Sequence, residues 1–171
     1  MTVELEEALV GGALELTLAG LLRRRLESEV YLGNITAGSE WSYQVPGDTL
    51  LELVSVYESF VTSATAATRI VNLAITDPQG QTVAVIPPAL TQAASLTYSY
   101  LWAERIASLS SLAGTESLGP LSTFALPPGW TIASQTTLLK AGDQHKGVCL
   151  IVRPLVLAQF ENQAQWIAKR L

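Results

Sequence analysis

Hydrophobic and polar positions alternate along most of the chain between about residues 43 and 157, which is the period of half-buried β-strands. The clearest stretch has Val54, Val56, Glu58 and Phe60 on one parity and mostly polar or aromatic side chains on the other. A strand with two such faces packs one of them into a core and turns the other outward. The pattern therefore predicts a β domain.

The most distinct hairpin follows a β-branched run at 70–76. The turn is predicted at Asp77-Pro78-Gln79-Gly80, where proline and glycine are both placed for a tight reversal, and the return strand at 81–86. Pro87-Pro88 then ends this strand, because proline cannot donate to a sheet ladder.

The remaining strands are short and closely spaced, and we expect a surface loop at 108–119, which is rich in Ser and Gly and low in charge. No helix of ten residues fits between the strands, which argues against a parallel α/β sheet. About eight strands with frequent turns predict an all-β fold, an antiparallel jelly-roll-like β-sandwich. The other strands are expected at 91–102, 124–126, 130–132, 135–140 and 147–157.

Helical spacing replaces alternation at both ends of the chain. At the N-terminal end it is interrupted by Gly11-Gly12 and Gly20, and the alternation at 14–18 leaves a strand possible. We therefore divide the chain into an N-terminal helical arm at 1–32, a sandwich domain at 33–157 and a short C-terminal helical tail at 158–171. The spaced apolar residues are Leu5, Leu9, Leu14, Leu18, Leu21 and Leu22 in the arm and Phe160, Ala164, Trp166, Ile167 and Leu171 in the tail.

Composition narrows the function. Apolar residues make up 49% of the chain and charged residues only 15%, with a formal net charge of −5. This balance, without a basic stripe, argues against nucleic acid as a direct ligand. The acidic start at Glu4 argues against a secretory signal, and the run at 8–22 is too short for a membrane span, so we expect a soluble protein without a membrane partner. Low charge also fits a surface that partners cover.

The sequence offers little catalytic chemistry. His145, the single histidine, lies in a polar segment and is interpreted as a solvated loop residue, and Cys149 as a buried thiol in an apolar strand. The dispersed carboxylates, among them Glu58 and Asp143, are interpreted as surface charge, because their spacing singles out no pair. We therefore predict no catalytic residue, no metal site and no cofactor.

Aromatic residues leave one alternative open. Trp41 and Tyr43 would share one strand face, as would Tyr98, Tyr100 and Trp102, and such faces can stack on sugar rings. Packing in a core or at a subunit interface is the more frequent use of aromatic side chains.

The segment from about Tyr57 to Val152 resembles the small β-sandwich decoration or cement proteins of tailed-bacteriophage capsids. The resemblance lies in a Ser/Thr/Ala-rich strand that leads into an Arg69 strand and an Asp-x-x-Gly hairpin. It continues in Leu126-Pro-Pro-Gly and in Ala141-Gly-Asp-Gln144. These are turn and strand signatures, so they concern the fold more than the role, and they leave the arm and tail uncovered.

The resemblance implies a non-enzymatic virion protein on the capsid surface, assembled in the host cytoplasm, that forms a homo-oligomer, often a trimer, and clamps the major capsid protein. The alternatives are another phage structural subunit (tail, connector or head fibre) and a carbohydrate-binding module for host recognition. The Arg23–Arg25 cluster could bind an acidic partner or could be the solvated end of a helix. The predicted protein-interface residues are Arg23, Arg24, Arg25, Phe60, Trp102, Phe160, Trp166 and Ile167.

Overall fold

The computed structural model describes residues 27–155, and every regular element in that range is a β-strand. No helix within these residues is long and apolar enough to cross a membrane. The strands are β1 (Ser28–Gly33), β2 (Ser42–Gln44), β3 (Leu51–Val61), β4 (Ile70–Thr76), β5 (Thr82–Ile86), β6 (Thr97–Ala103), β7 (Ser110–Leu112), β8 (Glu116–Pro120), β9 (Ala125–Leu126), β10 (Thr131–Thr137) and β11 (Gln144–Pro154).

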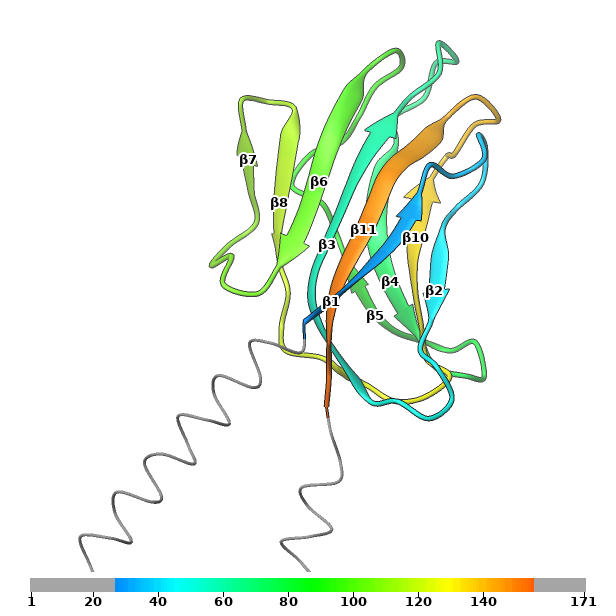
Figure 1. Cartoon of the computed structure of the whole chain (residues 1–171). Helices are drawn as coiled ribbons and strands as arrows, with labels where there is room; N and C mark the ends of the chain where they lie inside the picture. Colours follow the sequence, from blue (N-terminus) through cyan, green and yellow to red (C-terminus); the bar gives the residue numbers. More distant parts are fainter. Residues whose placement is uncertain (1–26, 156–171) are drawn as a thin grey trace, which may run out of the picture.

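The strands form two sheets that pack face to face (Figure 1). Sheet A has the order β1-β11-β3-β6-β8-β7, with β9 paired to β3, and sheet B has the order β2-β10-β4-β5. From β1 to β6 and again from β10 to β11 the chain alternates between the sheets, except at the β4–β5 hairpin. Eight strands, β1–β6, β10 and β11, wrap in this way with four in each sheet, which is the order of a jelly-roll-like sandwich. β7, β8 and β9 extend sheet A. The all-β prediction and the hairpin at 70–86 are confirmed.

Two features of the sandwich differ from the sequence prediction. The segment at 108–119 holds β7 and most of β8 rather than an unstructured loop, and β8 pairs with β6 in parallel, so sheet A is not wholly antiparallel. The inward positions of β8 are Ser117 and Gly119, both buried but neither strongly apolar, which explains why alternation did not reveal this strand. Gly119 lies opposite Trp102, and a methyl group there would overlap the indole ring.

The boundary between arm and sandwich also moves. Residues 28–32, assigned to the arm, form β1, whose Ser28 pairs with Val152 of β11. Val30 and Leu32 pack against the core, while Glu29 and Tyr31 are exposed, so the period here is two. The predicted helical arm before residue 27 and the helical tail after 155 lie outside the described residues.

The core lies between the two sheets and takes the inward residues of both. Val56, Glu58 and Phe60 are all fully buried, as their shared parity predicted. Val54 is an exception, because β3 carries one extra residue between the pairs Ser55–Ile151 and Leu53–Val152. This β-bulge moves Val54 off the inward face.

The sandwich has two ends with different roles. The terminal pole is the end where the described chain begins at Glu27 and finishes at Leu155 (Figure 1). The network pole is the opposite end, formed by the connections at 34–41, 62–69, 87–96 and 138–143.

Candidate functional site

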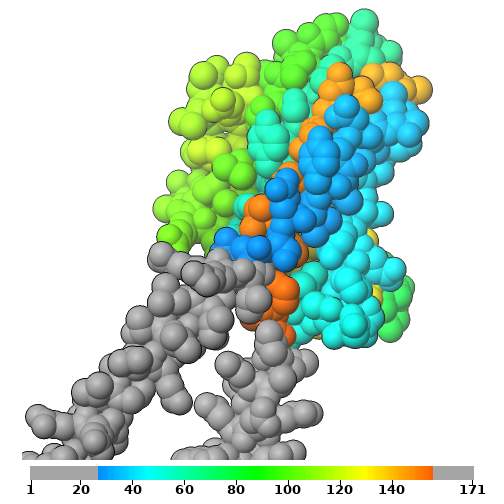
Figure 2. Space-filling view, in the orientation of Figure 1, coloured from blue at the N-terminus to red at the C-terminus, as the bar shows by residue number. Residues whose placement is uncertain are grey.

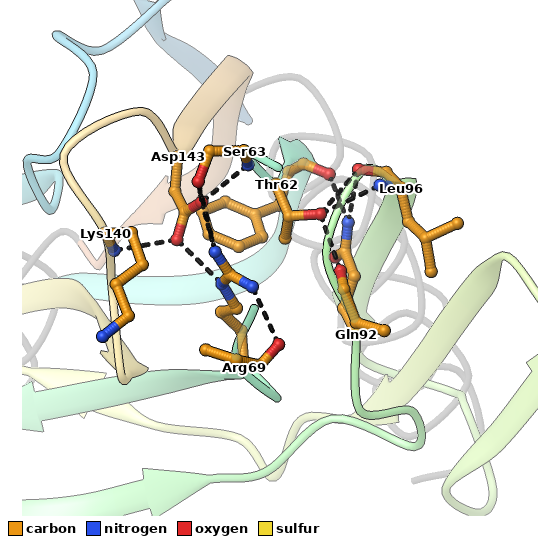
Figure 3. A network of polar contacts seen from close by, with 10 residues as sticks. Thr62, Ser63, Arg69, Gln92, Leu96, Lys140 and Asp143 are labelled. Carbon is orange, nitrogen blue, oxygen red and sulfur yellow. Dashed lines mark hydrogen bonds and ion pairs between the residues drawn. The ribbon is translucent and has the colours of Figure 1, made fainter. Parts of the chain in front are cut away.

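A buried ion pair joins the connections at the network pole. Arg69 donates from Nε to Asp143 Oδ2 and from Nη2 to Oδ1, both at 2.9 Å, and neither side chain is exposed (Figure 3). Asp143 also accepts hydrogen bonds from the backbone amides of Ser63 (2.7 Å) and Lys140 (2.8 Å). Burial by itself would raise the pKa of Asp143, but these hydrogen bonds outweigh it and lower the pKa to about 2.

Two glycines let these connections approach closely enough to form the pair. A methyl group on Gly142 would lie 2.9 Å from Ser63 Cβ, and one on Gly38 would lie 2.8 Å from Ala141 Cα. Gly38 also has a φ of +76°, which other residues rarely adopt, and its amide donates to the carbonyl of Asp143 at 2.7 Å. The turn around Asp143 is thus held by Ser63 and Arg69 of one connection and by Gly38 of another.

A second group of buried hydrogen bonds, also drawn in Figure 3, surrounds Gln92. Its Nε2 donates to the carbonyl oxygens of Phe60 and Leu96, both at 2.9 Å, and its Oε1 accepts from the hydroxyl of Tyr100. Thr62 closes the group by donating to the carbonyl of Ala93 at 2.7 Å. In the connection at 87–96, the carbonyl groups of Ala93 and Leu96 therefore have hydrogen-bond partners.

His145 is fully buried, so its interpretation as a solvated loop residue is wrong. Its Nδ1 lies 2.6 Å from Glu58 Oε2 and its Nε2 lies 3.2 Å from Glu40 Oε2. The Trp41 indole donates to the same Glu58 oxygen at 2.8 Å. Burial lowers the pKa of His145, but the hydrogen bonds and charges of the two carboxylates reverse this and raise it to about 9. The ring is therefore an imidazolium at neutral pH, which donates from both nitrogens.

Buried carboxylates hold the centre of this arrangement. Glu58 and Asp143, interpreted as surface charge, have no exposed side-chain area, so that interpretation is wrong for both. Within the described part of the chain, Glu58 Oε1 is buried without a hydrogen-bond partner, and Glu40, the other carboxylate on His145, keeps 33% of its side chain exposed. Among residues 27–155 no three His, Cys, Asp or Glu side chains are placed to hold a metal ion.

The predicted aromatic surface is part of the core. Tyr100 is 0% exposed, Trp102 1% and Trp41 2%, and the two rings of Tyr100 and Trp102 stack at 5.8 Å. These positions cannot present a platform to a sugar. Phe60 and Trp102, predicted as interface residues, are corrected for the same reason, since both are buried within the chain. The predicted interface residues Arg23, Arg24, Arg25, Phe160, Trp166 and Ile167 lie outside the described residues.

The outer face of sheet A carries a surface that alternation within single strands did not reveal. Paired residues of adjacent strands share a face, and successive pairs across five strands join apolar side chains into one row, half-buried except at Tyr31 (66% exposed) and Tyr57 (42%). The outer apolar row consists of Tyr31, Cys149, Tyr57, Leu101 and Leu118. Cys149 is therefore half-buried on this face, not in the core.

The same face is hollowed next to the terminal pole. The hollow has a volume of about 530 Å³, and Ser55 and Ala103 are among its lining residues. These two form a cross-strand pair next to the pair Tyr57–Leu101 of the outer apolar row. Arg153 lies in the wall of the hollow and forms ion pairs with Glu27 (2.8 Å) and Glu52 (2.5 Å), so the first described residue is tied to the last strand. The hollow is lined by Glu27, Val54, Ser55, Ala103, Glu104, Arg105 and Arg153.

Comparison with known proteins gives no family. No family model and no curated protein matches the chain. Among solved structures, it is similar to one of infectious bursal disease virus, Gx strain (11% identity, TM-score 0.36), covering 74% of this chain but only 31% of that one. A pentameric capsid protein from metagenomic phage sequences matches at 14% identity and TM-score 0.22, over 73% of this chain and 60% of that one.

An enzyme also appears among these structures. The catalytic domain of a GH87 α-1,3-glucanase matches at 12% identity and TM-score 0.28, over 75% of this chain and 26% of that one. The chain thus spans about a third or less of the infectious bursal disease virus and glucanase chains, and 60% of the phage capsid protein. Similarity at this level assigns the protein to no family.

One sequence signal could have revealed the buried centre. Glu58 stands between Val56 and Phe60 on the inward parity of a long strand. A carboxylate at such a position needs a buried donor or cation. With a single histidine in the chain, His145 was the natural candidate to test.

Proposed function

We propose that the protein is a structural virion subunit, a capsid cement or decoration protein that stabilises contacts between major capsid protein subunits. The observation that carries the proposal is that the first and the last described residues, Glu27 and Leu155, lie at one pole of the sandwich. Ser28 pairs with Val152 there, and Arg153 joins Glu27, so arm and tail start side by side. Two extensions from one end suit a module that is attached through that end and displays the rest.

The opposite end supports the same role. The network pole is held by buried hydrogen bonds and ion pairs. A sandwich closed in this way suits a protein that acts by buried area and copy number. The motif resemblance to decoration proteins of tailed phages points in the same direction, toward a homotrimer on the capsid surface, assembled in the host cytoplasm.

The test is the heat tolerance of particles. Particles without the protein should release DNA at a lower temperature than complete particles, and adding the purified chain back should restore the original temperature. The full-length double variant Phe160→Asp, Ile167→Asp should not restore the temperature if the tail attaches the protein. The matched control Asn162→Asp, Gln165→Asp, on the opposite side of the predicted helix, should restore it. Unchanged heat tolerance without the protein contradicts the cement role.

Imaging of labelled protein separates this role from that of another virion part. Cement gives many copies over the shell, whereas a tail, connector or head-fibre subunit gives a few copies at one vertex. A carbohydrate-binding role would instead require binding on a glycan array, and its site would have to lie away from the buried Tyr100 and Trp102.

A further inference from the structure

The outer apolar row is an unusual surface for a sandwich. Antiparallel sheets commonly turn a polar face to water, yet here five adjacent strands place Tyr31, Cys149, Tyr57, Leu101 and Leu118 side by side on the outer face of sheet A. The strands of sheet A face the viewer in Figure 2. The neighbouring register row adds Ile151, Ala103 and Pro120. A contiguous apolar patch of this kind marks a surface that another segment covers.

We propose that the outer apolar row is covered by residues 5–22 of the N-terminal arm of a neighbouring copy, so that the protein oligomerises by exchange of arms. This inference rests on the proposed function in that it specifies how the expected homo-oligomer forms. It adds which surface is covered, which segment covers it, and that this segment comes from another copy of the chain.

The length of the arm fits the row. From β1 to β8 the row crosses four inter-strand spacings, which is about 19 Å. A helix covers that distance with about 13 residues, and an extended strand with about six. The apolar stretch at 5–22 is long enough in either conformation.

The position of the arm also fits. The arm joins the sandwich at Glu27, which lines the hollow on the same face as the row. The hollow is lined by two carboxylates, Glu27 and Glu104, and two guanidinium groups, Arg105 and Arg153, so their charges balance. The fit of the arm therefore rests on its position and length.

The direction of β1 favours a neighbouring copy over the same chain. β1 runs from the terminal pole toward the network pole, so Glu27, the residue before it, lies at the terminal pole (Figure 1). Covering its own sheet would require the chain to reverse just before β1. Residues 21–27 contain no Gly, Pro, Asn or Asp, the residues that favour such a reversal.

The native Cys149, the second residue of the row, provides the test, because it is the only cysteine of the chain. In the full-length variant Leu18→Cys, mild oxidation should join position 18 of one chain to Cys149 of another. The product is a covalent dimer or larger species on a non-reducing gel, with the 18–149 peptide identified by mass spectrometry. The matched control Ala19→Cys, rotated by about 100° on a helix, should give at least fivefold less.

Three results would overturn the inference. An intramolecular 18–149 disulfide means that the chain covers its own face. Equal cross-linking at positions 18 and 19 means that the arm does not dock in a defined way. No 18–149 product at all means that another partner covers the row.

A second pair of variants probes the face itself. Tyr57→Glu, at an exposed position in the row, should reduce the cross-link at least fivefold while circular dichroism stays unchanged. Ser59→Glu, two residues along the same face of β3, should leave it within twofold. Equal cross-linking in both variants contradicts docking on the row. A failed cross-link together with heat-labile particles lacking the protein would overturn arm exchange and leave the cement role standing.

Discussion

The two poles of the sandwich are held together by different physical means. The network pole relies on Arg69–Asp143 and His145–Glu58, whose side chains are fully buried. The terminal pole relies on Arg153, whose partners Glu27 and Glu52 are partly exposed, and on the packing of Trp102 against Gly119. Charges withdrawn from water depend strongly on their partners, whereas exposed pairs are screened. The network pole should therefore be the more sensitive of the two to the loss of a charged partner.

The largest expected effect comes from breaking the pair at the network pole. Asp143→Ala leaves Arg69 buried without a counter-charge and removes the acceptor of the Ser63 and Lys140 amides. The free energy of unfolding should fall by about 3–5 kcal/mol in urea titration. The double variant Arg69→Met with Asp143→Leu should recover part of this loss, because no unpaired charge remains. Loss below 1 kcal/mol for the single variant would show that the pair is not closed to water.

The next effect is a dependence of stability on pH. The pKa of His145 is about 9 in the folded protein against an ordinary value of 6.5, so its contribution is complete below pH 6.5 and is lost as the pH rises through 9. The pKa of Asp143 is lowered to about 2 and that of Glu40 is also lowered, so their contributions are lost as the pH falls below about 4. The melting temperature should therefore be highest between about pH 5 and 6.5.

The variant His145→Gln isolates the alkaline part of this profile. It should be less stable at pH 6, and its melting temperature should change little between pH 6.5 and 9. A wild-type decline that persists in the variant would assign the alkaline loss to other groups.

A substitution that overpacks the terminal pole should lower the stability of the protein without altering any charged residue. Gly119→Ala forces a methyl group into the Trp102 indole and should cost about 1–3 kcal/mol, the usual range for overpacking. Gly47→Ala, whose methyl group would meet no atom within 4 Å, is the control and should change stability by less than about 0.5 kcal/mol. Equal effects of the two substitutions in urea titration would contradict close packing at this site.

The smallest effect is expected from the ion pairs of the terminal pole. Arg153→Ala should lower the free energy of unfolding by no more than about 1 kcal/mol, because its pairs are partly exposed. The loss should shrink further in 0.5 M salt. A loss as large as that of Asp143→Ala would remove the contrast between the poles.

Much of the sandwich follows from local patterns. The strand at 70–76 and its hairpin lie where β-branched residues and the Asp-Pro-Gln-Gly turn predicted them, since both signals act over a few neighbouring residues. β8 was missed because Ser117 and Gly119 are buried without being apolar, and only their partners explain why. β1 was assigned to the arm because the helical spacing before it obscured a short alternation.

The polar centre shows the same division. The sequence placed Glu58 on an inward parity but paired it with nothing, because its partner His145 is 87 residues away. Likewise Arg69 and Asp143 are 74 residues apart. Their burial results from connections that meet at one pole, and no local pattern encodes that meeting.

The sequence by itself thus determined the β class, the main turns and the change of pattern toward both ends, because strand period and turn chemistry are local properties. Only the tertiary structure decided which polar residues are buried, which strands are neighbours and where the outer apolar row lies. Each of these depends on register between distant segments, and a shift of one residue would move a side chain to the other face.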